Sequence, residues 1–268
     1  MHPLLFKFPD FIPLLGGHGI HTYGFMIALG FLFGWIYTVR ETRRLGLNEE
    51  RMVDFFFYVV VWALIGSRVM YLFNSVDNFW DDPFVIFRIW EGGLVFQGGV
   101  IGSLIFVIYY ARKYKFKFFQ VADIFAVPLA LGHGLGRIGC FFAGCCYGKP
   151  CGIDYIFGVV FPNNPDTVAP IGIALYPTQL FEASAEFLVF LFLIWYRRKK
   201  PFDGAVFLIY MMIYAVLRSV VEVYRGDKIR GFVIEPYLSI AQFISIIAMV
   251  LAMGAWLYLR KQQKATQK

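Results

Sequence analysis

Charged residues are scarce in this chain and make up only 16% of its 268 positions. Soluble domains carry about a quarter, so the scarcity argues against an ordinary soluble protein. The hydrophobic share is 59% and the mean hydropathy is +0.62, which together indicate an integral membrane protein. No internal repeat is visible, and the only biased tract is the polar tail 261–268.

The start of the chain also lacks the pattern of a cleavable signal peptide. A polar, proline-containing segment precedes the first apolar run, and no small-residue cleavage site follows it. The net charge of +7 does not indicate nucleic-acid binding, because the basic residues form short clusters between apolar runs. Such clusters are typical of the positive-inside signals of membrane proteins.

Seven apolar segments are long enough to cross a bilayer as helices, which takes about 20 residues each. They are expected near 19–39, 54–75, 94–111, 122–141, 178–196, 204–224 and 237–259. Pro128 and four glycines interrupt the fourth, so that helix is expected to kink or to end early. The pattern predicts an all-α, polytopic protein that forms a single integral membrane domain over residues 1–268.

Lysine and arginine divide unequally between the two sets of connections, with sixteen in one set and six in the other. The positive-inside rule therefore predicts an outer N-terminus and a cytoplasmic C-terminus. The outer connections then lie near 74–93 and 141–177. The first mixes aromatic and acidic residues, as an amphipathic surface element does. Four prolines and one Asn pair in 161–179 predict an irregular loop.

Six charged residues remain inside or at the edges of the apolar segments. Each costs roughly 2.5–3.5 kcal/mol or more at the bilayer centre unless it is paired or hydrated. They are Arg68, Arg137, Glu182, Glu186, Arg218 and Glu222, with Asp123 and Asp203 nearer the inner ends. Several arginines turned toward one cavity would suit a lipid phosphate, which guanidinium groups bind in a bidentate manner.

The sixth segment places Tyr214, Arg218, Glu222 and Arg225 on one helical face. One interpretation is an Arg218–Glu222 pair within the helix, with Arg225 extended to the headgroup level. The other is a cationic face turned into a cavity, which Arg137 in the same outer half favours.

Two further residues have both a structural and a functional interpretation. Glu182 is either a structural partner of Arg68 or Arg137, or a carboxylate that orients an arginine or takes a proton. His133, one turn before Arg137, is either a core residue or a base.

All four cysteines lie within twelve residues, as C-x4-C-C-x4-C from Cys140 to Cys151. This is not one of the usual zinc spacings. On an oxidising outer face, one or two disulfides that staple the loop are the favoured interpretation. A metal site is less favoured, and a covalent catalytic cysteine lacks an obvious base.

With these residues in view, the chain resembles the prolipoprotein diacylglyceryl transferase family. The matching pieces are HTYGFMIALGF, IGSRVMYLF, IWEGGLVFQGGVIG, FFQVADIFA, GHGLGRIGCFFAGCCYG, YPTQLFEA and YAVLRSVVEVYRG. The resemblance implies a bacterial inner-membrane enzyme that moves the diacylglyceryl group of phosphatidylglycerol onto the lipobox cysteine of a preprolipoprotein. A thioether forms and glycerol phosphate is released. The implied partners are phosphatidylglycerol, preprolipoprotein signal peptides and the bilayer, with no cofactor, metal or nucleic acid.

The resemblance also carries functional positions onto this chain. The expected catalytic residues are Tyr23, Arg137, Arg218 and Glu222. The expected substrate-binding residues are Arg137, Gly148, Gln97, Glu182, Tyr214 and Arg225. Fixed guanidinium groups would stabilise the charge that develops on the phosphate leaving group. A low-dielectric site with such groups would also help a thiol, with a pKa of about 8.5, to reach its thiolate.

Three positions depart from the family's pattern. Gln97 stands where many members have a histidine that is a proposed base, and Cys140 and Cys145 replace the usual Asn and Glu. The remaining candidates for the base are His133, His21 and Glu182. Two alternatives follow from these departures: a paralogue with a different acceptor, and a non-catalytic lipid-binding membrane protein.

Overall fold

The computed structural model describes residues 3–7, 19–75, 84, 93, 95–152, 154–163, 167–227 and 231–266, which form seven helices and three small two-stranded hairpins. The helices are α1 (Thr22–Arg44), α2 (Glu49–Ser75), α3 (Phe96–Tyr114), α4 (Phe118–Ala143), α5 (Thr178–Tyr196), α6 (Ala205–Tyr224) and α7 (Ile240–Thr266). The strands are β1 (Leu4–Lys7), β2 (Gly19–His21), β3 (Val159–Val160), β4 (Ala174–Leu175), β5 (Phe232–Ile234) and β6 (Leu238–Ser239). Each hairpin is antiparallel: β1 with β2, β3 with β4, and β5 with β6.

Each of the seven apolar segments forms a helix, so the predicted helical architecture is confirmed. Among the described residues, six helices are long and apolar enough to cross a bilayer: α1, α2, α4, α5, α6 and α7. The remaining helix, α3, has 19 residues, begins with Gln97 in its first turn and ends with Arg112 and Lys113 in its last. These polar residues lower its mean hydropathy. The chain is a multi-pass membrane protein.

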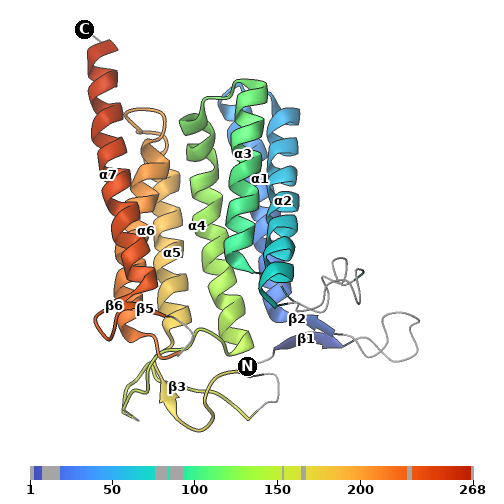
Figure 1. Cartoon of the computed structure of the whole chain (residues 1–268), viewed down its shortest axis with the longest axis vertical. Coiled ribbons are helices and arrows are strands. Elements are labelled where there is room, and N and C mark those ends of the chain that lie inside the picture. Colours follow the sequence, from blue (N-terminus) through green and yellow to red (C-terminus); the bar gives the residue numbers. More distant parts are fainter. Residues whose placement is uncertain are drawn as a thin grey trace. The chain divides into compact units, whose positions relative to one another are not determined.

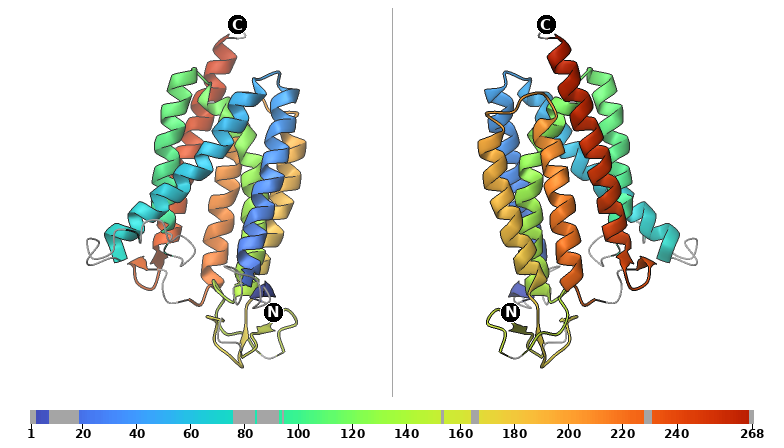
Figure 2. Two further views of the ribbon diagram at one scale, coloured as in Figure 1. Left: turned by 90° about the vertical axis from the view of Figure 1, so that its right-hand side faces the viewer. Right: turned by 90° about the vertical axis from the view of Figure 1, so that its left-hand side faces the viewer.

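The chain divides into two compact units, Met1–Gly34 with Ala122–Lys268, and Trp35–Val121. In the first unit α5 packs against α6, and α6 against α7, as Figure 1 shows. Figures 1 and 2 place β1, β2 and β3 at one end of these helices and the C-terminal end of α7 at the other. The C-terminal ends of α4 and α6 therefore meet the N-terminal end of α5 at the hairpin end.

Glycines allow the first unit's helices to approach closely. A Cβ on Gly30 of α1 would lie 3.2 Å from the Gly132 Cα of α4, and one on Gly139 of α4 would lie 3.0 Å from the Tyr23 ring. Small residues at such crossings are typical of membrane helices, because van der Waals contact must replace the hydrophobic drive that water supplies.

The second unit consists mainly of the α2–α3 hairpin, whose helices also meet through glycines. A Cβ on Gly66 would lie 2.2 Å from the Gly98 carbonyl oxygen, so the two backbones touch. Arg68 of this hairpin donates to the Gly93 carbonyl oxygen at 3.1 Å, and its guanidinium lies 5.0 Å from the centre of the Tyr71 ring.

Two expectations about the chain's irregular parts need correction. Pro128 does not end the fourth helix early, since α4 continues through it to Ala143, and the alternative of a kink stays a prediction. The segment 161–179 is not wholly irregular, because β4 pairs with β3 and the Ala174 carbonyl accepts from the Cys151 amide at 2.9 Å. Of the outer connection near 74–93, most lies outside the described residues, so its predicted amphipathic element is not described.

A buried carboxylate, that of Asp123, lies at the end of the first unit opposite the hairpins. Asp123 of α4 accepts from the Gly204 and Phe207 amides at 2.8 and 2.9 Å, and so caps the N-terminus of α6. Lys200 donates to Asp123 at 2.9 Å and to Asp203 at 2.8 Å. Burial alone would lower the pKa of Lys200, but these two hydrogen bonds outweigh it and raise the pKa above the ordinary lysine value.

Candidate functional site

The centre of the candidate site is an ion pair between α4 and α5. The Arg137 guanidinium lies 3.1 Å from the Glu182 carboxylate, and the two side chains are only 15% and 3% exposed. Glu182 lies at the start of α5, where Gly134 of α4 leaves room for the Glu186 and Ala183 turn to approach. Of the two arginines named as partners of a structural Glu182, Arg137 forms the pair. The pair fits both a structural glutamate and a carboxylate that orients an arginine.

His133 links this ion pair to a second buried carboxylate. Its Nδ1 lies 3.1 Å from the Glu186 carboxylate, and its Nε2 accepts a hydrogen bond from Arg137 Nε at 3.2 Å. Because a guanidinium can only donate, Nε2 carries no proton in this arrangement and Nδ1 donates to Glu186. Nε2 also lies 3.4 Å from Glu182. His133 is therefore part of a charged network and not an isolated core residue.

Helix α6 brings a second arginine to this network. Arg218 pairs with Glu222 at 2.7 Å, as the spacing predicts, and Glu222 is 2% exposed. The Nη1 atom of Arg218 is buried and has no hydrogen-bond partner among the described residues. The Tyr214 ring centre lies 5.2 Å from that of His133, which places this face of α6 against α4. The ion pair thus leaves one guanidinium nitrogen free for an anionic ligand.

Arg225, expected as a third cation, is neutralised by a neighbour that sequence reasoning missed. Its Nε donates to Asp227 at 2.9 Å, and a second guanidinium nitrogen completes a bidentate pair with the same carboxylate. Arg225 is only 8% exposed and its guanidinium is buried beside Asp227. Its extension to the headgroup level stays a prediction. The sequence feature that could have predicted this pair is the carboxylate of Asp227, only two residues after Arg225.

Gly148 clamps the loop after α4 to the end of α6. It forms an antiparallel bridge with Arg225, and its amide donates to the Tyr176 carbonyl at 3.0 Å. Lys149 donates to the Tyr224 carbonyl at 2.8 Å. A Cβ on Gly148 would lie 2.4 Å from the Tyr176 oxygen, so only glycine fits there.

The cysteines do not form the expected staple, since all four are free thiols in the structure. Three of them, Cys140, Cys145 and Cys146, gather their sulfur atoms within 4.8 Å of one another. Cys151 is not part of this group. Thiol hydrogen bonds from Cys140 and Cys145 lower the pKa of Cys146, and the Arg225 and Arg137 guanidinium groups act in the same direction against burial.

The two remaining predicted site residues belong to different compact units. Tyr23, at the start of α1, packs against Gly139 of α4, interacts electrostatically with Arg137 and Cys140, and is 44% exposed. Gln97 belongs to the second compact unit, where it is exposed on the first turn of α3. His21, a candidate base, is exposed in β2.

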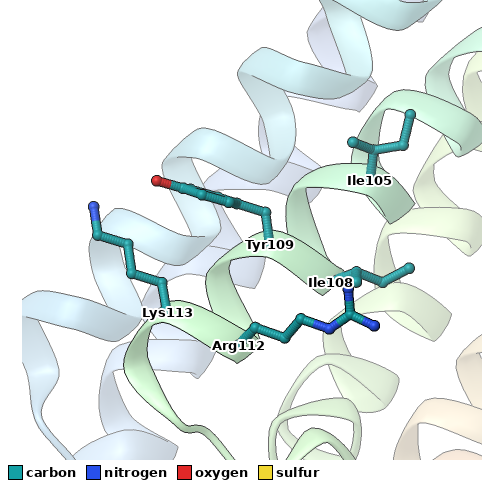
Figure 3. A pocket seen from close by; sticks show the side chains of 5 residues that line it. All are labelled: Ile105, Ile108, Tyr109, Arg112 and Lys113. Atoms are coloured by element: carbon teal, nitrogen blue, oxygen red, sulfur yellow. The ribbon is translucent and has the colours of Figure 1, made fainter.

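A separate pocket lies on one face of α3 and does not involve the buried network. It is lined by Ile105, Ile108, Tyr109, Arg112 and Lys113. Figure 3 shows Tyr109 and Lys113 on one side of the helix and Ile108 and Arg112 on the other. Its residues are apolar or basic and include no carboxylate or thiol, so it offers no group that could accept a proton in neutral solution.

These features define a multi-pass helical membrane protein with buried arginine, carboxylate and imidazole groups at one end of α4, α5 and α6. A model of the family described as "Prolipoprotein diacylglyceryl transferase" matches residues 9–258. The chain belongs to the prolipoprotein diacylglyceryl transferase family.

Three similar proteins are named for the same activity. The phosphatidylglycerol–prolipoprotein diacylglyceryl transferase of Clostridium tetani is 37% identical over 251 residues, which cover 94% of this chain and 95% of the relative. The second such transferase of Clostridium perfringens is 36% identical, over 87% of this chain and 89% of the relative. The transferase of Legionella pneumophila is 33% identical, over 96% of this chain and 100% of the relative.

Proposed function

We propose that this protein transfers the diacylglyceryl group of phosphatidylglycerol to the lipobox cysteine of a preprolipoprotein. The thiol sulfur forms a thioether with the glyceryl carbon, and glycerol phosphate leaves. Family membership and the names of the relatives support this activity. Within the structure, the observation that carries it is the buried Arg218 Nη1 without a partner, beside the Arg137–Glu182 pair and the His133 network.

Arg137 and Arg218 are proposed to hold the phosphate of the lipid. Both guanidinium groups already pair with a buried carboxylate, so their charge and orientation are fixed before a ligand arrives. Such preorganised donors stabilise charge that develops in a transition state without reorganisation. Here that charge appears on the phosphate oxygen as the bond to the glyceryl carbon breaks.

His133 is proposed as the base that Gln97 cannot be. Its Nε2 now accepts from Arg137, and a phosphate that attracts this guanidinium would free Nε2 for a proton. Glu186, on the opposite ring nitrogen, would stabilise the imidazolium that forms. Glu182 positions Arg137, while Tyr23, Tyr214, Glu222, Arg225, Gly148 and Gln97 are proposed to complete the catalytic and lipid-binding surface.

We further propose that seven helices span the membrane, with α3 as the third, and that both compact units act as one membrane domain. The charge bias between connections supports an outer N-terminus, a cytoplasmic C-terminus and a site toward the outer face of a bacterial inner membrane. The position of β1 at the end opposite the C-terminal end of α7 supports the same arrangement.

The test is a lipidation assay in membranes that contain this protein. Phosphatidylglycerol and a lipobox peptide should yield a peptide heavier by one diacylglyceryl group, together with glycerol phosphate. The Arg137→Lys variant should lose about 100-fold or more of this rate, because lysine cannot reproduce the bidentate contact. Arg43→Lys, which changes an exposed arginine paired with Glu49, should retain it.

A second candidate function follows from Gln97, Cys140 and Cys145, which alter the family's usual signature. They favour a paralogue that cleaves the same lipid but transfers to another acceptor. Release of glycerol phosphate without peptide lipidation would support that function. A protein that binds phosphatidylglycerol and releases nothing would instead be a lipid-binding protein, and neither transferase function would stand.

A further inference from the structure

Three cysteine side chains converge at the C-terminal end of α4. The Sγ atoms of Cys140, Cys145 and Cys146 lie within 4.8 Å of one another. Thiolates bound to one Zn²⁺ at about 2.3 Å stand about 3.8 Å apart in a tetrahedron. Small side-chain movements therefore bring all three to a single ion. We propose that these cysteines form a zinc site, and that its open fourth position binds the acceptor thiol.

The backbone between the cysteines is bent in a way that serves this convergence. Gly144 and Cys146 have φ angles of +68° and +59°, and Cys146 is one of two non-glycine residues with positive φ among the described residues. A side chain in this region costs free energy, and such residues occur at ligand clamps. The Cys145 amide donates to the Cys140 carbonyl at 3.1 Å, so the turn folds both later sulfurs back toward the helix end.

Side chains from α5 hold this turn from outside. Thr178 donates to the Cys146 carbonyl at 2.9 Å, and Gln179 donates to the Cys145 carbonyl at 2.7 Å. Both residues are 1% exposed. These bonds fix the backbone of the two adjacent cysteines without engaging their sulfurs, of which that of Cys145 donates to the Cys140 carbonyl at 3.7 Å. Outer groups that orient metal ligands in this way are a regular part of metal sites.

The cluster offers three ligands and not four. No further histidine, cysteine, aspartate or glutamate of the described residues joins the group, and Cys151 lies outside it. Structural zinc sites are closed by four protein ligands, whereas sites with three keep a position for water or substrate. The ligand count therefore favours a site that binds a reactant.

Neighbouring charges suit a zinc ion with thiolate ligands. Three thiolates and one Zn²⁺ carry a net charge of −1, which is costly to bury. The guanidinium groups of Arg225 and Arg137 both interact electrostatically with Cys146. Each is also paired with a carboxylate, Arg225 with Asp227 and Arg137 with Glu182, so they offset part of this charge. They place the cluster beside the arginine that is proposed to hold the lipid phosphate.

The role of the open position rests on the proposed transferase function. The acceptor thiol would bind zinc as its thiolate and give its proton to the base, since coordination deprotonates a thiol. The sulfur then forms a bond to the glyceryl carbon as that carbon's bond to the phosphate oxygen breaks. The electron pair leaves with glycerol phosphate, which takes up a proton, and zinc is neither oxidised nor reduced. Zinc would thus help to activate the thiol in a chain that has Gln97 where many family members have a histidine.

The metal itself is tested without any activity assay. The full chain, purified in detergent without chelators, should contain one equivalent of zinc by mass spectrometry. Cys145→Ser and Cys146→Ser should lose it, whereas Cys151→Ser should keep it. Wild-type protein that holds no zinc and takes up none when Zn²⁺ is added would overturn the site. A thiol count that rises from two to four on reduction would do the same, because it would show a disulfide.

Cobalt tests the open position in the unaltered protein. Co²⁺ in place of zinc should give a thiolate charge-transfer band, and a lipobox peptide with cysteine should shift that band while its serine analogue should not. If the cysteine peptide is lipidated but does not shift the band, the metal does not bind the acceptor thiol, and the proposed transferase function still stands. If the band shifts but no peptide is lipidated, the metal site stands and the transferase function does not.

Discussion

Arg137 is held by two different groups, and this arrangement determines what a ligand must displace. A phosphate that approaches its guanidinium competes with the neutral His133 Nε2 more easily than with the charged Glu182 carboxylate. The contact with Glu182 is an attraction between opposite charges, whereas the imidazole acceptor is neutral. The lipid is therefore expected to free the imidazole and to leave the ion pair intact.

Glu186→Gln should separate the electrostatic role of this carboxylate from its packing role. Glutamine keeps an acceptor for His133 Nδ1 but cannot stabilise an imidazolium. We expect lipidation to fall about 10-fold or more and the melting temperature to change little. Glu49→Gln, an exposed carboxylate paired with Arg43, serves as the control. Unchanged lipidation in Glu186→Gln would mean that His133 is not the base.

Gly148→Ala should destabilise the protein because the added methyl group meets backbone. Its Cβ would lie 2.4 Å from the Tyr176 oxygen, whereas a Cβ on Gly152, four residues later, meets nothing within 4 Å. Overpacking of this kind costs about 1–3 kcal/mol. Thermal unfolding in detergent should show a lower melting temperature for Gly148→Ala than for wild type. The melting temperature of Gly152→Ala should stay almost unchanged. Equal effects would show that the close approach does not limit stability.

At the level of elements, hydrophobic length predicted the helices well because a bilayer allows few other structures. Backbone groups in lipid must be satisfied within a helix, so seven apolar runs became seven helices. The i, i+4 rule gave the Arg218–Glu222 pair as one of two interpretations, because residues four apart lie on the same helical face. Contacts between elements that lie far apart in the sequence could not be predicted from it in the same way. The partners of His133, and the clamp of Thr178 and Gln179 on the cysteines, depend on how α5 packs and leave no periodic signal.

The cysteine loop shows where local reasoning failed. Spacing and compartment favoured a disulfide, but the αL conformation of Cys146 turns its sulfur toward Cys140 and Cys145 together. No rule of spacing encodes that turn, because it is imposed by side chains 32 to 34 residues away. Likewise, Asp227 neutralises Arg225 through a geometry that counting charges could not show.

The ion pairs of Lys200 give the α5–α6 junction a defined pH dependence. Its pKa in the folded protein is raised above the ordinary value of 10.5. The stability that its charge contributes is therefore fully present below that pH and is lost as the pH rises through the folded pKa. Wild type should unfold at a higher temperature than Lys200→Met at pH 8, and the gap should narrow only above pH 10.5. A gap that narrows earlier would contradict the raised pKa.

At the scale of the whole molecule, the proposed orientation places the two ends of α7 on opposite sides of the membrane. A fluorescent protein fused after Lys268 should fold and fluoresce, because the C-terminus is proposed to be cytoplasmic. Alkaline phosphatase fused after Gly226 should be active, since that point is proposed to face outside. Phosphatase activity of the Lys268 fusion, or an inactive Gly226 fusion, would reverse or break the proposed topology.

The cap on α6 has a consequence for the order in which the chain assembles. The amides of Gly204 and Phe207 are satisfied by Asp123, a residue made more than 80 positions earlier. During insertion, the start of α6 is therefore completed only when it docks against a helix that is already in the membrane. Asp123→Ala should slow the acquisition of protease resistance by newly made chains, measured by pulse-chase, whereas Asp203→Ala should not. In this sense α4 acts as a template for the helices that follow it.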